Sequence, residues 1–482
     1  MQIQRLQPIL GAIALALLCL PAALATSATA HEGLVGRANP DFPAPDVDPF
    51  YKPSGNLAAA RRGQVLRRRS FPSVFAGPDL EKSFHLLYRT EDTFNQPEAT
   101  VASIFVPAKP SSPPRILSVQ AWVDSNSPDC AYSWAVVKDS GSGTAIENFL
   151  DPGTYIKWAL SKGYYVVTPD FLGPKSTFIA GYQSGQAILD GIKALIRDQN
   201  LPKDTAVGMV GYSGGAHATV WASTLHEKYA PELNIVGAAH GGTPIDPKNT
   251  LLFLNGGHYA GFAAAGLIGL KDTYPKLDAY IESIITDKGR TVLSRFKQAG
   301  YCVLQVSGSE SDGLNIFNYT TVKDPLDNPV AVEVLKRESL LESYADRELP
   351  VPKFPRFLYH ALGDDIVPYN DEQQYVKDQC ARGANIQFST LLLANHLVGV
   401  FAGVAPSIDF LQQAFEDKTP NVACGSVLPA LEISLDSNKA DDVMGKGVAD
   451  QARAGRDKAE GLFGGLGSSH RRRFVRDRRG RN

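Results

Sequence analysis

The sequence has no excess of charge of either sign. Its 482 residues include 48 lysines and arginines and 50 aspartates and glutamates, which gives a formal net charge of −2 at pH 7. A protein that attracts nucleic acid or another polyanion through its overall field needs a clear basic surplus. The composition therefore excludes nucleic acid as an expected partner.

Long apolar runs are also scarce, and the sequence contains a single one. This run, Ile9–Ala25, follows Arg5, is interrupted by Pro21 and leads into small residues. A transmembrane anchor would need a longer unbroken run, whereas a signal peptide has a short apolar core and a small-residue cleavage site. We therefore predict a signal peptide over residues 1–30, a secreted mature protein and no transmembrane segment.

Cysteine is rare, with five in the whole chain and one of them inside the predicted signal peptide. The other four are Cys130, Cys302, Cys380 and Cys424. Their spacings match no zinc-binding pattern, so we predict no metal site. In an oxidising compartment four cysteines favour two disulfides, and the sequence leaves all three pairings open. A sequon at Asn318 predicts glycosylation of the secreted protein.

Apolar runs of strand length alternate with helical patterns along most of the chain. Strands are expected at Phe84–Tyr88, Ala99–Val106, Ile116–Val123, Tyr164–Thr168, Ala206–Tyr212, Ile235–Ala239, Phe357–Leu362 and Ile386–Leu393. Helical periodicity between them includes Thr154–Lys162 and Gly185–Asp198. Continuous apolar strands that alternate with helices predict an α/β fold, in which a mostly parallel sheet is flanked by helices.

This alternation stops between residues 245 and 345, where one helical pattern follows another. We therefore predict a core formed by residues 31–244 and 346–438, with a helical cap inserted at 245–345. Glycines in the first part of the cap favour a movable lid, with a rigid helical layer as the alternative. Residues 439–482 are polar, rich in glycine and end in arginine clusters, so we predict a disordered basic tail.

One short segment carries a specific chemical signal, the single G-x-S-x-G pattern of the chain. It occupies residues 211–215, with Ser213 at its centre, and leads into a helical pattern over Gly214–Glu227. An exposed nucleophilic serine requires a sharp strand-to-helix turn, which glycines two residues before and after it make possible. Ser213 is therefore predicted to be a nucleophile, with a glycine-rich turn of no catalytic role as the alternative.

A serine nucleophile needs a base to accept its proton and an acid to orient that base. In doubly wound hydrolase sheets these residues follow the serine in the order acid, then histidine. His396 lies on a loop after the late strand-like run Ile386–Leu393, where a base can reach the serine. Asp364 begins a D-x-x-V-P turn after the preceding strand and is the predicted acid, with Asp365 as the alternative.

The tetrahedral oxyanion of such a reaction needs two backbone N–H donors. One is expected from Gly214, the residue after the nucleophile, and the other from a loop after an early strand. Asp124 is the candidate, because the strand-like run Ile116–Val123 ends there. The chain contains no His-Gly-Gly-Gly loop, so the donor is not of that esterase type.

Four segments of the sequence also carry a resemblance. They are Ser118–Ala131, Gly211–Ala216, His240–Pro244 and Asp364–Tyr369. As a set they resemble the fungal secretory lipase family of the α/β-hydrolase superfamily, and the similarity extends over about residues 50–430. The resemblance implies an α/β-hydrolase core, a helical cap between nucleophile and acid, and hydrolysis of acylglycerol esters without a cofactor.

The resemblance also implies a role for each matching residue. It makes Ser213 the nucleophile, Asp364 the acid and His396 the base. It assigns the oxyanion hole to Asp124 and Gly214. It implies the disulfides Cys130–Cys302 and Cys380–Cys424.

These observations favour a secreted lipase that hydrolyses triacylglycerol. We expect a monomer that binds a lipid or ester substrate, including at an oil–water interface. A carboxylesterase that deacetylates a soluble metabolite is the alternative. A catalytically inactive lipid-binding protein is less favoured, because all three residue types of a triad are present in the required order.

Overall fold

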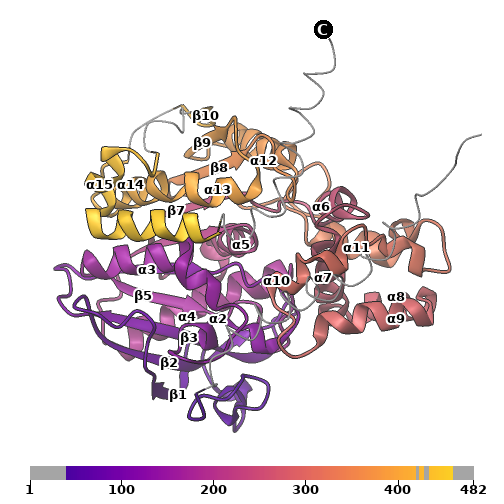
Figure 1. Cartoon of the computed structure of the whole chain (residues 1–482), viewed down its shortest axis with the longest axis horizontal. Coiled ribbons are helices and arrows are strands. Elements are labelled where there is room, and N and C mark those ends of the chain that lie inside the picture. The colour runs from indigo at the N-terminus through magenta and orange to yellow at the C-terminus, as the bar shows by residue number, and fades with distance from the viewer. Residues whose placement is uncertain (1–38, 420–422, 428–433, 460–482) are drawn as a thin grey trace, which may run out of the picture.

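The computed structural model describes residues 39–419, 423–427 and 434–459, which surround a ten-stranded sheet (Figure 1). The predicted signal peptide lies outside these residues. The strand order is β1-β2-β3-β5-β4-β6-β7-β8-β9-β10. Strands β1 to β3 pair antiparallel, β3 pairs antiparallel with β5, and every pairing from β5 to β10 is parallel. The predicted α/β fold with a mostly parallel sheet is confirmed.

The strands coincide with the apolar runs of the sequence, with additions at the two edges of the sheet. They are β1 Val65–Ser70, β2 Leu80–Glu91, β3 Pro97–Pro107, β4 Arg115–Gln120, β5 Tyr165–Pro169, β6 Ala206–Tyr212, β7 Asn234–Gly241, β8 Arg356–Ala361, β9 Ile386–Leu391 and β10 Ser426–Val427. The register brings the ends of the central strands together, because Gly211 pairs with Gln120 on one side and His240 on the other. Side chains that follow β4, β6 and β7 therefore meet at one edge.

Helices cover both faces of this sheet (Figure 1). They are α2 Tyr132–Ala135, α3 Asp151–Ser161, α4 Gly181–Asp198, α5 Gly214–Tyr229, α12 Tyr369–Ala381, α13 His396–Ala402, α14 Val404–Phe415 and α15 Asn438–Met444. Leu411 and Phe415 of α14 lie over Gly208, whereas Thr219 of α5 lies over Gly211. Because positions 208 and 211 point to opposite faces of β6, α14 and α5 cover opposite faces.

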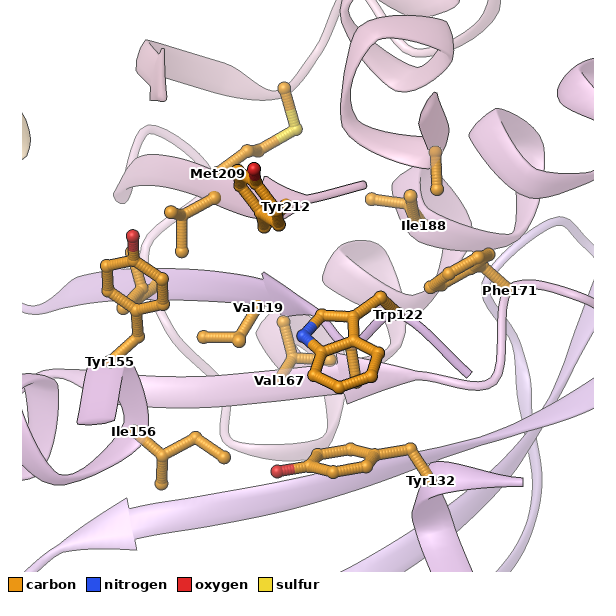
Figure 2. Packing of buried hydrophobic residues seen from close by; sticks show 14 of the residues in the cluster. Val119, Trp122, Tyr132, Tyr155, Ile156, Val167, Phe171, Ile188, Met209 and Tyr212 are labelled. Carbon is orange, nitrogen blue, oxygen red and sulfur yellow. The ribbon is translucent and has the colours of Figure 1, made fainter. Parts of the chain in front are cut away.

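The hydrophobic core lies between the sheet and these helices. Figure 2 shows Val119 of β4, Val167 of β5 and Tyr212 of β6 packed with residues from the flanking helices. Trp122, which follows β4, is buried, and its indole N–H donates a hydrogen bond to Asp151 of α3 at 2.8 Å. The loop that leaves β4 is thus fixed by the core from its first residues.

A run of helices without a regular strand separates β7 from β8. It contains α6 Pro247–Leu254, α7 Ala260–Thr273, α8 Pro275–Ile284, α9 Asp287–Ser294, α10 Val303–Val306 and α11 Pro329–Arg337. Two glycines of α7 allow close packing, because a Cβ on Gly261 would lie 1.9 Å from the carbonyl oxygen of Val306. A Cβ on Gly269 would lie equally close to that of Phe178. The absence of a side chain at these two glycines therefore lets α7 pack closely against Val306 and Phe178.

Short 3₁₀ turns connect several of these elements. They are Pro49–Tyr51, Leu57–Ala59, Pro128–Cys130, Ala145–Phe149, Arg295–Lys297, Ser309–Ser311, Ile316–Tyr319 and Pro325–Asp327. In the residues that the structure describes, no single helix is long and apolar enough to cross a membrane. The bent pair α13 and α14 reaches that length and composition together, across a 43° bend.

Two parts of the chain differ from the sequence-based prediction. Strand β1 was not predicted, since three of its six residues are arginines, yet the guanidinium of Arg68 lies 3.7 Å from the ring centre of Phe84. The prediction of a disordered tail from residue 439 is wrong for its described part, because α15 and a helix over 446–459 are present. Both helices bury small apolar side chains, Ala440, Met444, Ala449 and Ala452 among them. The remainder of the predicted tail, 460–482, lies outside the described residues.

Two disulfides link distant parts of the chain, Cys130–Cys302 and Cys380–Cys424. They are the pairs that the family resemblance implies. The first joins the segment after β4 to the helical insertion and closes 172 residues, whereas the second closes 44. A cross-link stabilises a fold mainly by restricting the unfolded chain, and the effect increases slowly with the length of the closed loop.

Replacing Cys130 and Cys302 together by alanine should therefore lower the free energy of unfolding by about 4 kcal/mol. The Cys380→Ala/Cys424→Ala variant is the matched control and should lose slightly less, because its loop is shorter. Thermal unfolding of both variants and the wild type measures the difference. An unchanged midpoint for Cys130→Ala/Cys302→Ala would contradict the prediction.

Candidate active site

The predicted nucleophile lies on a strained turn between β6 and α5. Ser213 has φ 52° and ψ −122°, a conformation that side chains rarely adopt. A Cβ on Gly211 would lie 2.4 Å from the carbonyl oxygen of Gly215, and one on Gly215 would lie 2.1 Å from that of Gln120. Neither position can hold a larger residue without movement of the backbone. The G-x-S-x-G pattern therefore follows from close packing of β6, β4 and α5.

The three residues predicted as a triad lie in hydrogen-bonding order. Nε2 of His396 is 2.9 Å from Oγ of Ser213, and Nδ1 of His396 is 2.7 Å from Oδ2 of Asp364. His396 is the first residue of α13, and its carbonyl oxygen accepts a hydrogen bond from the hydroxyl of Tyr212 at 2.7 Å. His396 is therefore held both at its imidazole and at its backbone, and Nε2 of the imidazole points toward Ser213.

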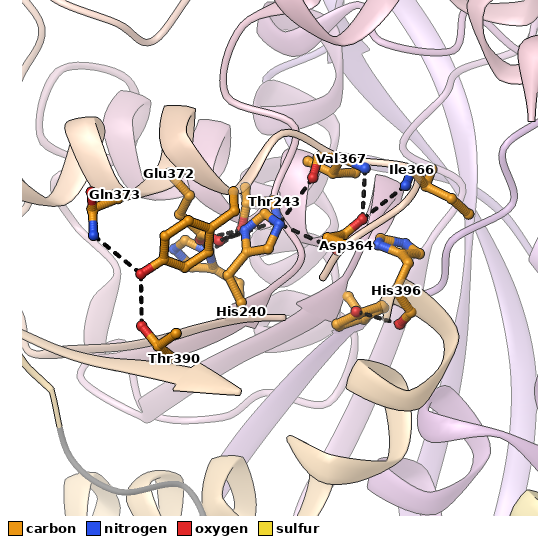
Figure 3. Close-up of polar contacts among 12 residues, drawn as sticks. His240, Thr243, Asp364, Ile366, Val367, Glu372, Gln373, Thr390 and His396 are labelled. Atoms are coloured by element: carbon orange, nitrogen blue, oxygen red, sulfur yellow. Dashed lines mark hydrogen bonds and ion pairs between the residues drawn. The ribbon is translucent and has the colours of Figure 1, made fainter. Parts of the chain in front are cut away.

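The carboxylate of Asp364 is oriented by its own turn (Figure 3). Its Oδ1 accepts hydrogen bonds from the backbone N–H groups of Ile366 and Val367 at 2.9 and 2.7 Å, which leaves Oδ2 toward His396. Burial alone would raise the pKa of Asp364, but the charge of His396 and hydrogen bonds from neighbouring histidines lower it below the usual value. Asp364 is therefore a carboxylate at neutral pH.

Asp365, the alternative acid, has a different place. Its Oδ1 accepts a hydrogen bond from the backbone N–H of His396 at 3.3 Å and does not contact the imidazole nitrogens. Asp365 therefore supports the start of α13, and the geometry selects Asp364 as the partner of the imidazole.

Asp124 lies beside the nucleophile, as expected of a residue in the oxyanion hole. It has φ 42°, and its Oδ1 lies 1.9 Å from the point where a Cβ on Gly214 would be. This carboxyl oxygen is buried and has no hydrogen-bond partner among the described residues. Burial raises the pKa of Asp124 well above its ordinary value, which favours the protonated carboxyl group.

Ser213, Gly214 and Asp124 open into one predominantly apolar pocket. Its empty space, open solvent at its mouth included, is about 1070 Å³. Most of the lining comes from the helical insertion between β7 and β8. These residues are Leu251, Leu254, Phe262, Leu267, Leu270, Leu277, Ile281, Ile316, Phe317, Leu326, Ala331 and Leu335. The insertion therefore forms the wall opposite the serine.

Asn318, the predicted glycosylation site, lies in the insertion on the 3₁₀ turn Ile316–Tyr319, and its side chain is exposed. The site is therefore accessible for modification, and its glycosylation stays a prediction.

Two functional candidates were not predicted from the sequence. His360, at the end of β8, contacts Asp364, and Glu372 of α12 contacts His360 from the other side. Burial alone would lower the pKa of His360, but hydrogen bonds with Asp364 and Glu372 raise it to about 10. The only sequence signal is a histidine four residues before the acid, and nothing local indicates its partner on a separate helix.

Comparison with known proteins agrees with this architecture. The family model described as secretory lipase matches residues 146–422. The chain belongs to the secretory lipase family. Lipase A of Moesziomyces aphidis is 44% identical to this secretory lipase over 438 residues, which are 91% of this chain and 94% of the relative. The secreted triacylglycerol lipase LIP1 of Malassezia furfur is 31% identical over 78% of this chain and 77% of its own length.

Solved structures of similar proteins have the same fold as this chain. The structure of Candida antarctica lipase A in its closed state has a TM-score of 0.82 at 44% identity and covers 86% of this chain and 95% of its own. A rice cell wall degrading esterase, LipA of Xanthomonas oryzae, has a TM-score of 0.56 at 16% identity, over 74% of this chain and all of its own. The second likeness shows the α/β-hydrolase fold alone.

Replacing Gly211 by alanine in this secretory lipase should lower the free energy of unfolding by about 3 kcal/mol, because the new Cβ would overlap the backbone of Gly215. Hydrolytic activity should fall with it, since the turn that holds Ser213 must move. Gly447→Ala is the matched control, because a Cβ there has no atom within 4 Å. Thermal unfolding and a hydrolysis assay measure both effects. Equal stability of the two variants would refute the packing argument.

Proposed function

We propose that this secretory lipase hydrolyses triacylglycerol through an acyl-enzyme intermediate on Ser213. The observation that carries the proposal is the hydrogen-bonded series Ser213, His396 and Asp364, whose serine lines an apolar pocket. A catalytically inactive lipid-binding protein would have no need of this geometry or of the backbone strain at Ser213.

In the first half of the reaction, Oγ of Ser213 attacks the ester carbonyl carbon while Nε2 of His396 accepts the hydroxyl proton. A bond forms between Oγ and the carbonyl carbon, and the carbonyl oxygen takes the negative charge. When this tetrahedral intermediate collapses, the bond to the glyceride oxygen breaks. Nε2 of His396 then donates its proton to that leaving oxygen, which departs as an alcohol.

In the second half, water attacks the acyl-enzyme with His396 as the base, and the fatty acid leaves as Ser213 recovers its proton. The carboxylate of Asp364 stabilises the imidazolium that forms in each half and keeps one tautomer of His396. The position of Asp364 Oδ2, 2.7 Å from Nδ1, supports this role.

The oxyanion is proposed to bind between the backbone N–H groups of Gly214 and Asp124. The carboxyl group of Asp124 can add a third donor when protonated, which burial favours, because Asp124 lines the same pocket as Ser213. A carboxyl group kept neutral by burial can serve this purpose at a developing negative charge.

The apolar lining of the pocket supports a long acyl chain as the preferred substrate over the acetyl group of a soluble metabolite. Burial of each methylene of an acyl chain contributes about 0.8 kcal/mol of binding free energy. The predicted signal peptide and the two disulfides support a secreted protein, and such a lipase would meet its substrate at an oil–water interface.

Replacement of Ser213 by alanine should reduce the hydrolysis of trioctanoin by at least about 10⁴-fold and leave the thermal midpoint nearly unchanged. A fluorophosphonate should label the wild type at Ser213 and fail to label the variant, which peptide mass spectrometry measures. Retained hydrolysis in the folded variant would refute the mechanism.

Acyl-chain preference tests the substrate. A Cβ on Gly266 would meet Ile179 at 3.7 Å, so α7 tolerates a side chain there that extends into the pocket. Gly266→Leu should lower kcat/KM for p-nitrophenyl palmitate by about tenfold or more and that for the acetate by less than about threefold. Gly447→Leu, outside the pocket, is the matched control. Equal losses for both esters would contradict a long-acyl site, and a wild-type preference for acetate would favour the carboxylesterase.

A further inference from the structure

A buried pair of charged side chains lies directly behind the acid of the triad. Nδ1 of His360 is 2.6 Å from Oε2 of Glu372, and Nε2 of His360 is 3.2 Å from Oδ2 of Asp364. That oxygen of Asp364 also accepts the hydrogen bond from Nδ1 of His396. Figure 3 shows Glu372 on one side of Asp364 and His396 on the other. A continuous series of contacts therefore links α12 to the nucleophile Ser213.

The contacts of His360 determine its charge. Nδ1 faces only the carboxylate of Glu372, and Nε2 faces Asp364 and the carbonyl oxygen of Val367 at 3.2 Å each. All of these atoms are hydrogen-bond acceptors, so each nitrogen of the imidazole must carry a hydrogen. His360 is therefore an imidazolium between two carboxylates.

Glu372 is in turn surrounded by donors. Its Oε1 accepts a hydrogen bond from the hydroxyl of Thr243 at 2.6 Å and lies 3.5 Å from Nδ1 of His240, and the backbone N–H of Thr243 lies 3.4 Å from Oε2. Burial alone would raise the pKa of Glu372, but hydrogen bonds and the charge interactions with His240 and His360 lower it. The pair is thus neutral as a whole, with its positive end toward Asp364.

We infer that His360 and Glu372 are positioning residues for the hydrolysis proposed above, because the imidazolium of His360 fixes the carboxylate of Asp364 and offsets part of its negative potential at His396. The inference rests on the proposed function. Among the described residues, His360 and His396 are the two side chains in contact with Oδ2 of Asp364. Part of the negative potential that Asp364 exerts on His396 is therefore cancelled by His360.

Other titratable and charged groups face this series from every element around it. They are Tyr212 of β6, His240 of β7, Tyr259 before α7, Arg356 of β8, Asp365 of the acid turn, and Tyr369 and Asp371 of α12. Arg356 is engaged with Tyr375 and Gln379, and the carboxylate of Asp365 with the backbone of His396. His360 is therefore the cation placed to act on Asp364.

The double variant His360→Gln/Glu372→Gln tests the inference. It removes both charges of the pair, keeps the net charge and retains amide groups that can hydrogen-bond at both positions. Without the cation His396 should become more basic, so the acid limb of kcat/KM for p-nitrophenyl butyrate should move to higher pH by about one unit. Maximal kcat should fall by about tenfold with KM little changed, because Asp364 is held less firmly. The pH dependence of fluorophosphonate labelling should shift by the same amount.

Glu338→Gln is the matched control. Glu338 is equally buried, accepts hydrogen bonds from Tyr274 and the backbone N–H of Gly181, and lies outside the triad series. Its replacement should leave both pH profiles in place. A double variant with a lower thermal midpoint and unshifted profiles would show that the pair only stabilises the fold and would overturn the inference. A wild type that neither hydrolyses esters nor reacts with the phosphonate would instead overturn the proposed function.

A measurement on the wild type covers the case in which the double variant does not fold. With its pKa raised to about 10, His360 should keep both protons well above neutral pH in ¹⁵N-histidine spectra. The stability that this protonation contributes is complete below the unfolded pKa of about 6.5 and is lost as pH rises through about 10. If no histidine of the folded protein retains two protonated nitrogens at about pH 8.5, the inference is wrong.

Discussion

The close approach of β4, β6 and α5 at the nucleophile is the constraint on which the rest of the site depends. Two carbonyl oxygens occupy the space that a Cβ on Gly211 or Gly215 would need, so the chain can turn in one residue, Ser213. The strain at this residue is sustained by packing of two strands and a helix that are buried on all sides. The other proposed catalytic groups are positioned relative to a serine whose backbone is confined by this packing.

The site contains two buried carboxyl groups, and their surroundings have opposite effects on their ionisation. Asp364 is ionised because two backbone N–H groups and two imidazoles surround it, whereas burial raises the pKa of Asp124 because a backbone hydrogen bond does not offset the loss of water. An acid that must orient a base needs the first environment, and a group beside a developing oxyanion needs the second. Both carboxyl groups are buried, and the difference comes from their immediate partners.

The parts of this arrangement that were predictable from sequence depend on local backbone requirements or on chain order. The glycines around Ser213 and the order of Asp364 and His396 are of that kind. The role of His360 was not predictable, because its partner Glu372 comes from a different element and its burial is tertiary. The helix over 446–459 was not predicted because its apolar face is built from alanines between charged residues. Such a composition is also typical of disordered segments.

The insertion is joined to the oxyanion segment at a defined place. Cys302 forms a disulfide with Cys130, and the adjacent carbonyl oxygen of Tyr301 accepts a hydrogen bond from the hydroxyl of Ser125 at 2.7 Å. Ser125 directly follows Asp124, so the wall of the pocket and the proposed oxyanion hole are anchored to each other within two residues. The insertion cannot leave this point without disturbing Asp124, because a covalent bond and a partly buried hydrogen bond hold it there. Access of a bulky ester must therefore be accommodated at the other helices that line the pocket.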